Sequence, residues 1–115
     1  MIGGPRSRPE VIIRYFDADA RRDTDAIVSL FTEDAVVIDE SQTWRGSNEI
    51  RAWREGPAAR YEYTTEVDGT DRAGDDEYIT TGRLEGNFPG GTAALRWRFT
   101  LAGDLIRRLH IAPPG

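Results

Sequence analysis

The sequence contains no cysteine. It also contains no lysine, because all 15 of its basic residues are arginine. Without cysteine there is no thiol nucleophile, no disulfide and no thiolate metal site. Without lysine there is no Schiff base, no pyridoxal phosphate anchor and no Walker-type phosphate loop. His110 is the only histidine, so a metal site is not expected. We therefore expect chemistry without a cofactor, carried by carboxylates, tyrosine, arginine or His110.

Long apolar runs and an excess of positive charge are also missing. The longest aliphatic run is Ala35 to Ile38, which is far too short for a membrane span or a signal-peptide core. The net charge is −5 and the pI is near 4.9, whereas nucleic acids and anionic membranes favour positively charged partners. We expect a cytoplasmic protein that binds neither nucleic acid nor membranes.

The residues that are present indicate a folded domain. Eleven aromatic residues (three Trp, four Tyr and four Phe) argue against disorder, although 30% of the residues are charged. A chain of 115 residues is long enough to bury a core without disulfides. We expect one domain over residues 1–115, with an ordered core of about residues 7–112.

Helical patterns dominate the first half of the chain. Ser7 and Glu10 have the spacing of a capping box, which predicts that the first helix begins near Ser7 and turns Tyr15 inward. Asp23 precedes a second helical pattern as its N-cap, and Gly46-Ser47 marks a turn and the N-cap of a third helix. The predicted elements are a helix from Ser7, a helix from Asp23 that reaches Phe31, a strand over residues 35–39 and a helix over residues 48–54.

Alternation of apolar and polar residues dominates the second half. It predicts four strands in an antiparallel meander, over residues 60–67, 77–87, 92–101 and 105–111. In the third strand Trp97 and Phe99 share one face, while Arg96 and Arg98 share the opposite face. In the last strand the more apolar set is Leu105, Arg107, Leu109 and Ile111, and the other set is Ile106, Arg108 and His110.

These elements predict an α+β fold with three N-terminal helices packed on a curved antiparallel sheet. Such a sheet, wrapped around few helices, forms a cone with an internal pocket for a small hydrophobic ligand. Inward aromatic side chains are the expected lining of that pocket, although packing in the core alone would also explain them. They are Phe16, Trp44, Trp53, Tyr63, Phe88, Trp97 and Phe99.

Five segments carry a family resemblance: residues 14–16 (RYF), 23–31 (DTDAIVSLF), 33–39 (EDAVVID), 45–50 (RGSNEI) and 103–106 (GDLI). They resemble the nuclear transport factor 2-like superfamily, in its SnoaL-like and ketosteroid-isomerase-like branch. The resemblance spans about Pro9 to Ala112 and implies the helix-covered cone, or cystatin-like roll. It also implies a homodimer formed through the polar outer face of the sheet, although charges there could equally pair within one chain.

Tyr15 and Asp39 match the ketosteroid-isomerase pattern residue by residue. The resemblance implies that Tyr15 is the oxyanion donor and Asp39 the general base. A buried tyrosine hydroxyl needs a partner, which a developing enolate oxygen would supply. An aspartate that ends an apolar strand is partly desolvated, which raises its pKa and makes it a better base near neutral pH. The resemblance therefore agrees with elementary chemistry at both positions.

The residues alone leave other roles open. Asp39 could cap the following turn or pair with Arg45, and Tyr15 could be a core residue whose hydroxyl reaches the surface. His110 is a further catalytic candidate, but a lone histidine on a strand is also typical of a structural or interfacial position.

The sequence departs from the ketosteroid-isomerase pattern at its third group. That family places a protonated acid on the strand expected at residues 92–101, whereas no Asp or Glu lies between Gly86 and Gly103. Arg96 is nearest to the expected position. The alternation favours an outward side chain, and the alternative is that Arg96 turns the oxyanion site into a cationic clamp. Steroid isomerisation itself is therefore not expected.

Three hypotheses remain for the function. In the first, an isomerase, cyclase or dehydratase acts on a hydrophobic carbonyl compound, with Asp39 removing a proton next to the carbonyl and Tyr15 donating to the oxyanion. In the second, a ligand-binding or dimerisation module of the same fold carries out no chemistry. The third, epoxide hydrolysis, needs two pocket carboxylates bridged by an arginine, and the sequence shows only one such carboxylate.

Overall fold

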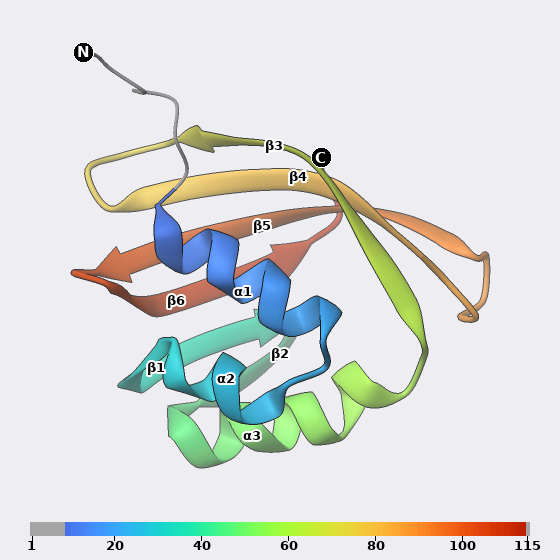
Figure 1. Ribbon diagram of the computed structural model, residues 1–115, viewed down its shortest axis with the longest axis horizontal. Coiled ribbons are helices and arrows are strands. Elements are labelled where there is room, and N and C mark those ends of the chain that lie inside the picture. The colour runs from blue at the N-terminus through green and yellow to red at the C-terminus, as the bar shows by residue number, and fades with distance from the viewer. Residues whose placement is uncertain (1–8, 115) are drawn as a thin grey trace.

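The computed structural model describes residues 9–114, which form helices and strands in an α+β arrangement (Figure 1). None of the described helices is long and apolar enough to cross a membrane. In chain order the elements are α1 (Glu10–Ala20), α2 (Thr24–Ser29), β1 (Phe31–Asp39), β2 (Gln42–Arg45), α3 (Gly46–Glu55), the 3-10 helix η1 (Pro57–Ala59), β3 (Tyr63–Arg72), β4 (Glu77–Gly86), β5 (Thr92–Ala102) and β6 (Leu105–Ala112).

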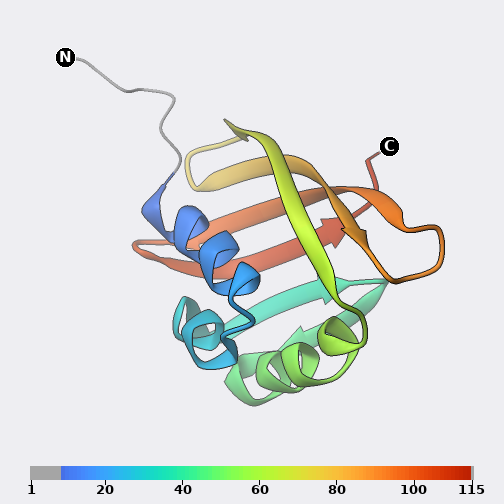
Figure 2. The same cartoon turned by 45° about the vertical axis from the view of Figure 1, so that its right-hand side comes forward.

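The strands form one six-stranded sheet in the order β2-β1-β6-β5-β4-β3. β3 to β6 pair antiparallel in succession, which confirms the predicted meander. The expectation of a wholly antiparallel sheet is wrong at one pairing, because β1 runs parallel to β6. A parallel pair needs a long crossover, and α3 and the meander lie between these two strands in the chain. The helices lie on one side of the sheet, which curves around them (Figure 2).

The core lies between the helices and the inner face of the sheet. α1 contributes Ile12 and Tyr15, α3 contributes Ile50 and Trp53, and β5 contributes Phe99, all of them buried. Aromatic rings meet edge to face, with 5.6 Å between the ring centroids of Tyr15 and Phe99. Burying a large apolar side chain stabilises a fold by about 1.5–3 kcal/mol. This packing fixes the inner faces of α1 and α3, from which the site is built.

The start of α2 agrees with the prediction, whereas the start of α1 does not. Asp23 is the N-cap of α2, as predicted, and its side chain accepts a hydrogen bond from the backbone N–H of Ala26 at 3.1 Å. The predicted start near Ser7 is wrong for α1, because the helix begins at Glu10 and Pro9 is extended, with ψ of 142°. Ser7 lies outside the described residues.

The helix α3 begins at Gly46, two positions before the predicted start. The N-cap is Arg45 and not Gly46-Ser47, and its backbone N–H donates to the side chain of Glu49 at 2.7 Å. The helix therefore begins at the predicted turn, but its N-cap, Arg45, lies one residue before Gly46.

The first two strands form a hairpin that the sequence did not reveal. β1 begins at Phe31, which the helical pattern had assigned to the second helix. β1 and β2 are joined by Glu40 and Ser41, whose φ angles are 53° and 65°. Two residues with positive φ make a type I′ turn, which usually contains Asn or Gly. Because this turn contains neither, the sequence gives no signal for β2.

Two strands of the meander depart from the predicted pattern. β3 begins at Tyr63, three residues late, because η1 keeps the preceding chain helical. In β6 a register shift opposite Thr100 and Leu101 interrupts the alternation. Ile106 is therefore buried and Leu105 exposed, the reverse of the predicted faces. After the shift, Leu109 and Ile111 are buried as predicted.

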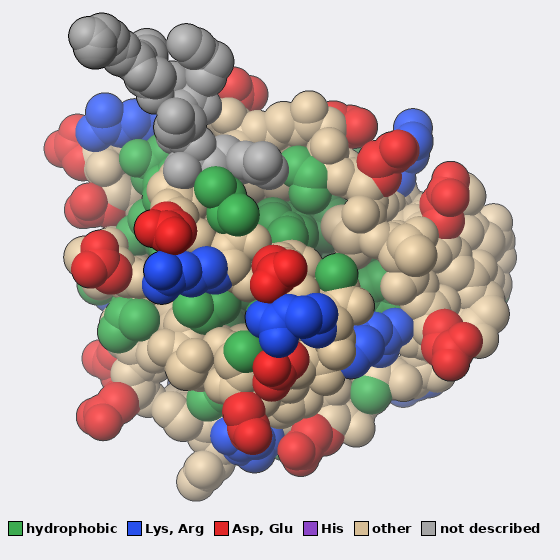
Figure 3. All heavy atoms as spheres, viewed as in Figure 1, with side chains coloured by type: hydrophobic (Ala, Val, Ile, Leu, Met, Phe, Trp, Pro, Cys, Tyr) green, Lys and Arg blue, Asp and Glu red, His purple; other side chains and the backbone are tan. Residues whose placement is uncertain are grey.

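Charged side chains lie over the helices and on the outer face of the sheet. Figure 3 shows acidic and basic side chains next to one another on the helical side. On the outer face, Glu66 pairs with Arg83 and Glu77 with Arg98 across neighbouring strands. Charges on this face therefore do pair within one chain, and the homodimer stays a prediction.

Candidate active site

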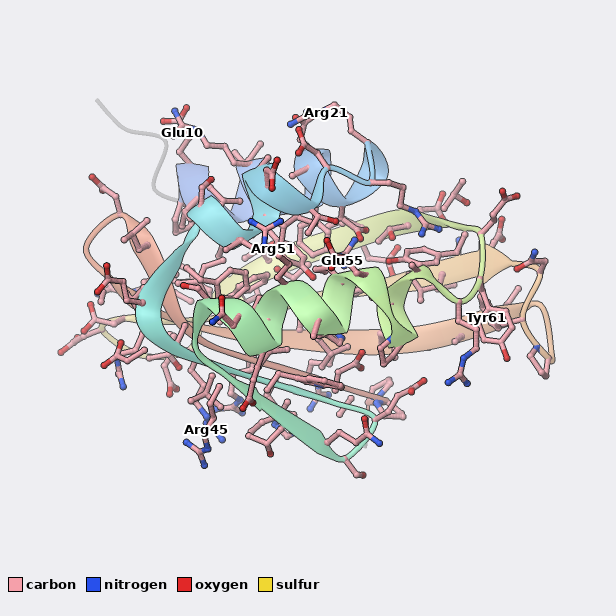
Figure 4. The ribbon with its side chains drawn as sticks, turned by 90° about the horizontal axis from the view of Figure 1, so that it is seen from below. Glu10, Arg21, Arg45, Arg51, Glu55 and Tyr61 are labelled. Carbon is pink, nitrogen blue, oxygen red and sulfur yellow. The ribbon has the colours of Figure 1, made fainter. Side chains whose placement is uncertain are left out.

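A cavity of about 510 Å³ lies between the curved sheet and the helices α1 and α3. Its volume is typical of a site for a small molecule. The exposed lining residues, which mark its mouth, are Glu40, Arg60, Pro89 and Pro113. Tyr61 also lines it and lies beyond the C-terminal end of α3 (Figure 4). Four chain segments that are distant in sequence therefore meet around one opening.

Asp39 enters this cavity from the end of β1. The Trp53 indole N–H donates to Asp39 Oδ2 at 3.0 Å. Burial raises the pKa of the Asp39 carboxyl, and the Trp53 hydrogen bond opposes part of that rise. The alternative partner, Arg45, lies opposite Val36 in the hairpin register, whereas Gln42 lies opposite Asp39. Asp39 is therefore a half-buried carboxyl on a cavity wall.

Tyr15 reaches the same cavity from the inner face of α1. Only 2% of the residue is exposed, and its ring packs edge to face on Phe16 and Phe99. Within residues 9–114 its hydroxyl has no hydrogen-bond partner, and no fully buried polar side-chain atom there is unpaired. Burial raises the pKa of Tyr15 well above its ordinary value. The hydroxyl is therefore protonated at neutral pH and directed to the cavity.

A buried ion pair, Asp19 with Arg54, forms a second polar group on the cavity wall. Arg54 Nη2 lies 2.8 Å from Asp19 Oδ1, and the side chains are only 4% and 7% exposed. The Tyr63 hydroxyl donates to the same oxygen at 2.8 Å, and the Thr65 hydroxyl donates to Asp19 Oδ2 at 3.3 Å. Three donors from α3 and β3 thus hold one carboxylate of α1.

This ion pair also shapes the electrostatics of its neighbours. Burial acts against the charge of Arg54, but nearby Tyr15 and Asp19 keep the pKa of the guanidinium above its usual value. Burial, reinforced by the charge of Asp19, raises the pKa of Tyr63 to about 12. The arginine is therefore charged and the tyrosine neutral across the ordinary pH range.

Sequence reasoning missed Asp19 and Arg54, although one signal was present. Asp19 follows Tyr15 by four positions, so both lie on the same face of α1. A carboxylate on the apolar face of a helix is rarely buried unless it is paired. That pattern could have indicated a buried cation elsewhere, but nothing in the sequence indicated which of the arginines.

The structure brings four of the seven predicted aromatic lining residues to the cavity: Trp53, Tyr63, Phe88 and Trp97. The other three, Phe16, Trp44 and Phe99, are not part of its wall. Phe16 and Phe99 pack in the layer behind it, with Phe16 5.2 Å from the ring centroid of Trp97. Trp44 lies on β2 and packs on the core. These three support the wall and do not form it.

His110 and Arg96 lie away from the cavity. His110 pairs with Ile38 of β1 and Arg98 of β5, between the inward side chains of Leu109 and Ile111. It is not among the lining residues. Arg96 is exposed on the outer face, as the alternation predicted. Within residues 9–114 no three His, Cys, Asp or Glu side chains are grouped as metal ligands.

Known structures share this architecture. A candidate polyketide cyclase from Sinorhizobium meliloti is 33% identical, with a TM-score of 0.86, 91% of this chain covered and 95% of that one. A protein of ketosteroid isomerase-like fold from Catenulispora acidiphila, in complex with trimethylamine, is 19% identical (TM-score 0.81; 92% and 86% covered). The epoxide hydrolase/cyclase-like enzyme SalBIII, which has a role in pyran ring formation in the polyether salinomycin, is 22% identical (TM-score 0.79; 91% and 88%).

Family membership rests on the sequence as well as on the fold. No curated protein matches the chain. The SnoaL-like domain family matches it over residues 12–109, from α1 to β6. This range includes Tyr15, Asp19, Asp39 and Arg54. The chain belongs to the SnoaL-like domain family.

Proposed function

We propose that this protein is an enzyme that transfers a proton, without a cofactor, on a hydrophobic carbonyl compound bound in the cavity. One observation carries the proposal: a carboxyl of raised pKa, Asp39, and an unpartnered hydroxyl, Tyr15, line the same largely apolar cavity. A base and a hydrogen-bond donor are the two groups that enolisation requires.

The proposed reaction begins at the carbon next to the substrate carbonyl. Asp39 takes the proton, the C–H electrons form a carbon–carbon double bond, and the carbonyl oxygen becomes an oxyanion. Tyr15 donates to that oxygen. Trp53 donates to one oxygen of Asp39, and no other side chain within residues 9–114 donates to this carboxyl. Return of the proton to a different carbon gives isomerisation. Attack of the enolate carbon on a second carbonyl instead closes a ring and forms an alkoxide, which takes the proton back from Asp39.

The shape of the cavity supports a flat apolar substrate. Aromatic side chains form much of its wall, including Trp53, Trp97 and Phe88. The similarity to the candidate polyketide cyclase supports ring closure as the outcome of the proton transfer. We therefore favour a cyclase or isomerase acting on an aromatic or polycyclic ketone.

The test is exchange of the acidic carbon-bound protons of a flat bicyclic ketone, 2-tetralone, in heavy water, followed by NMR. The parent protein should accelerate this exchange over buffer, and Asp39→Asn should lower the acceleration by about 10²- to 10⁴-fold. Asp34→Asn is the matched control, because Asp34 is exposed on the same strand. If the parent gives no acceleration, or Asp39→Asn matches it, the chain is a binding module or uses another base.

A second candidate, epoxide opening with ring closure, is favoured by one observation. A second carboxylate, Asp19, and an arginine, Arg54, line the same cavity as Asp39. The fold shared with SalBIII agrees with this candidate. Hydrolysis of styrene oxide, measured by chromatography of the diol, distinguishes the two candidate functions. Under epoxide opening the parent should form the diol, and both Asp19→Asn and Asp39→Asn should abolish its formation. Under proton transfer the parent should form no diol.

We also propose that the protein forms a homodimer through the outer face of the sheet, as the family resemblance implies. Arg96 and Glu62 are exposed there and belong to neither of the cross-strand ion pairs described above. Light scattering at micromolar concentration tests this: a mass near twice 12.9 kDa supports the dimer, and a monomer mass rejects it.

A further inference from the structure

Arg54 brings a buried positive charge to the wall of the cavity. Its side chain is 4% exposed, and its guanidinium lies over the ring of Trp53, 5.1 Å from the centroid. Both residues line the cavity, as does Tyr15. A guanidinium has five N–H donors and no acceptor, so it can form hydrogen bonds only with groups that carry negative charge or lone pairs.

The protein uses only part of this donor capacity. Nη2 donates to Asp19 Oδ1, whereas Nε and Nη1 have no acceptor within residues 9–114. No fully buried side-chain nitrogen in that range lacks a partner, so these two atoms keep accessible surface, and Arg54 is a lining residue of the cavity. The Tyr15 hydroxyl is in the same situation on the same wall. Two kinds of donor therefore face one cavity without a protein acceptor.

Asp19 holds Arg54 in place for this purpose. Its carboxylate accepts from Arg54, Tyr63 and Thr65, which fix it from two different elements. A donor that is fixed before the charge develops stabilises an oxyanion without reorganisation. Asp19, which also lines the cavity, thus positions the guanidinium and balances its charge.

We propose that Tyr15 and Arg54 together form a cationic oxyanion site, and that the ligands of this protein are flat apolar molecules with an ionisable oxygen, such as a phenol or the enol of a 1,3-dicarbonyl compound. This inference rests on the proposed function, for which it names the substrate class. Arg54 takes the place of the protonated acid that the strand at residues 92–101 lacks.

Charge balance agrees with this assignment. When Asp39 takes a proton from carbon, the carboxylate becomes neutral and the substrate oxygen becomes negative, so the total charge in the cavity does not change. A ligand that arrives already ionised lacks this compensation while Asp39 is charged. The site should therefore bind ionised ligands more tightly when Asp39 is protonated or replaced by asparagine.

The test compares 4-nitrophenol with 4-nitroanisole, which has the same shape but no ionisable oxygen. Just below the pKa of free 4-nitrophenol, the probe bound to Asp39→Asn should absorb as the phenolate, because this variant lacks the competing charge of Asp39. If the bound probe absorbs as the neutral phenol, the site is not cationic and the proposal is overturned.

The variant for this test is Asp19→Asn with Arg54→Met, which removes both charges together and leaves no unpaired buried ion. It should lose about 10- to 100-fold in affinity for the phenolate, and less than about two-fold for 4-nitroanisole. The single variant Arg54→Lys keeps the charge and should therefore bind the phenolate more tightly than the double variant does. Equal phenolate affinity in the parent and the double variant would also overturn the proposal.

Arg51→Met is the matched control. Arg51 lies three residues earlier on α3 and points toward α1 and α2 (Figure 4), where it pairs with Asp25 at 2.7 Å. The Arg51→Met variant should bind both probes as the parent does. Phenolate binding in Asp39→Asn, together with a parent that fails to accelerate exchange in 2-tetralone, would reject the proton transfer and keep the oxyanion site. Exchange activity with neutral-phenol binding would do the reverse.

Discussion

Two carboxylates line one cavity, and their surroundings differ. Asp19 is paired with Arg54 and also accepts from Tyr63 and Thr65, whereas the Asp39 side chain accepts from one side chain, the indole of Trp53. Side chains donate to both oxygens of Asp19, whereas a side chain donates to only one oxygen of Asp39. One carboxylate therefore holds the site together, and the other is available for proton transfer.

The largest expected effect concerns activity at Asp39. Asp39→Asn should lower ketone proton exchange by about 10²- to 10⁴-fold, because it removes the base but preserves the shape and the acceptor for Trp53. Its unfolding free energy in urea at neutral pH should be no lower than that of the parent. A loss of stability with unchanged exchange would give Asp39 the role assigned to Asp19.

The next effect concerns stability at the Asp19 ion pair. Arg54→Met leaves a buried carboxylate without its counterion, which should cost about 3–5 kcal/mol of unfolding free energy. Asp19→Asn with Arg54→Met should recover most of that loss, since no charge is then unpaired. Urea denaturation measures both. A single variant as stable as the parent would show that the pair is not an anchor.

A smaller effect is expected at the donors to Asp19. Tyr63→Phe removes one hydrogen bond to a buried carboxylate, which should cost about 1.5–3 kcal/mol, again measured by urea denaturation. The pH at which proton exchange is half-maximal should not move, because Tyr63 does not contact Asp39 in the hydrogen-bond network. A shift of that midpoint would show that the two carboxylates act as one unit.

The smallest effect is the pH dependence of stability. Folding raises the pKa of Asp39, so between the ordinary value of about 3.9 and the raised value the folded state binds the proton more tightly. The contribution of Asp39 to stability is then present below that window and lost as pH rises through it. Asp39→Asn should therefore gain stability relative to the parent between about pH 3 and neutral pH. The opposite trend in urea denaturation would argue against desolvation of Asp39.

The two halves of the site differ in how well the sequence predicted them. Tyr15 and Asp39 could be predicted because local patterns place them, one on the inner face of a helix and one at the end of a strand. The Asp19 network could not, because its partners lie 35 to 46 positions away in the chain and meet it only after packing. The failure to predict strand β2 has a local cause, because the Glu40-Ser41 turn before it contains neither Asn nor Gly.

The central claim is that Asp39, and not Asp19, is the base. The most direct measurement is the titration of the Asp39 carboxyl carbon by NMR, assigned with Asp39→Asn, alongside the pH dependence of proton exchange in 2-tetralone. We expect one common midpoint, above the ordinary aspartate value, and no such midpoint in the variant. An Asp39 carboxyl that titrates at its ordinary value, or exchange that persists in the variant with the same midpoint, would contradict it.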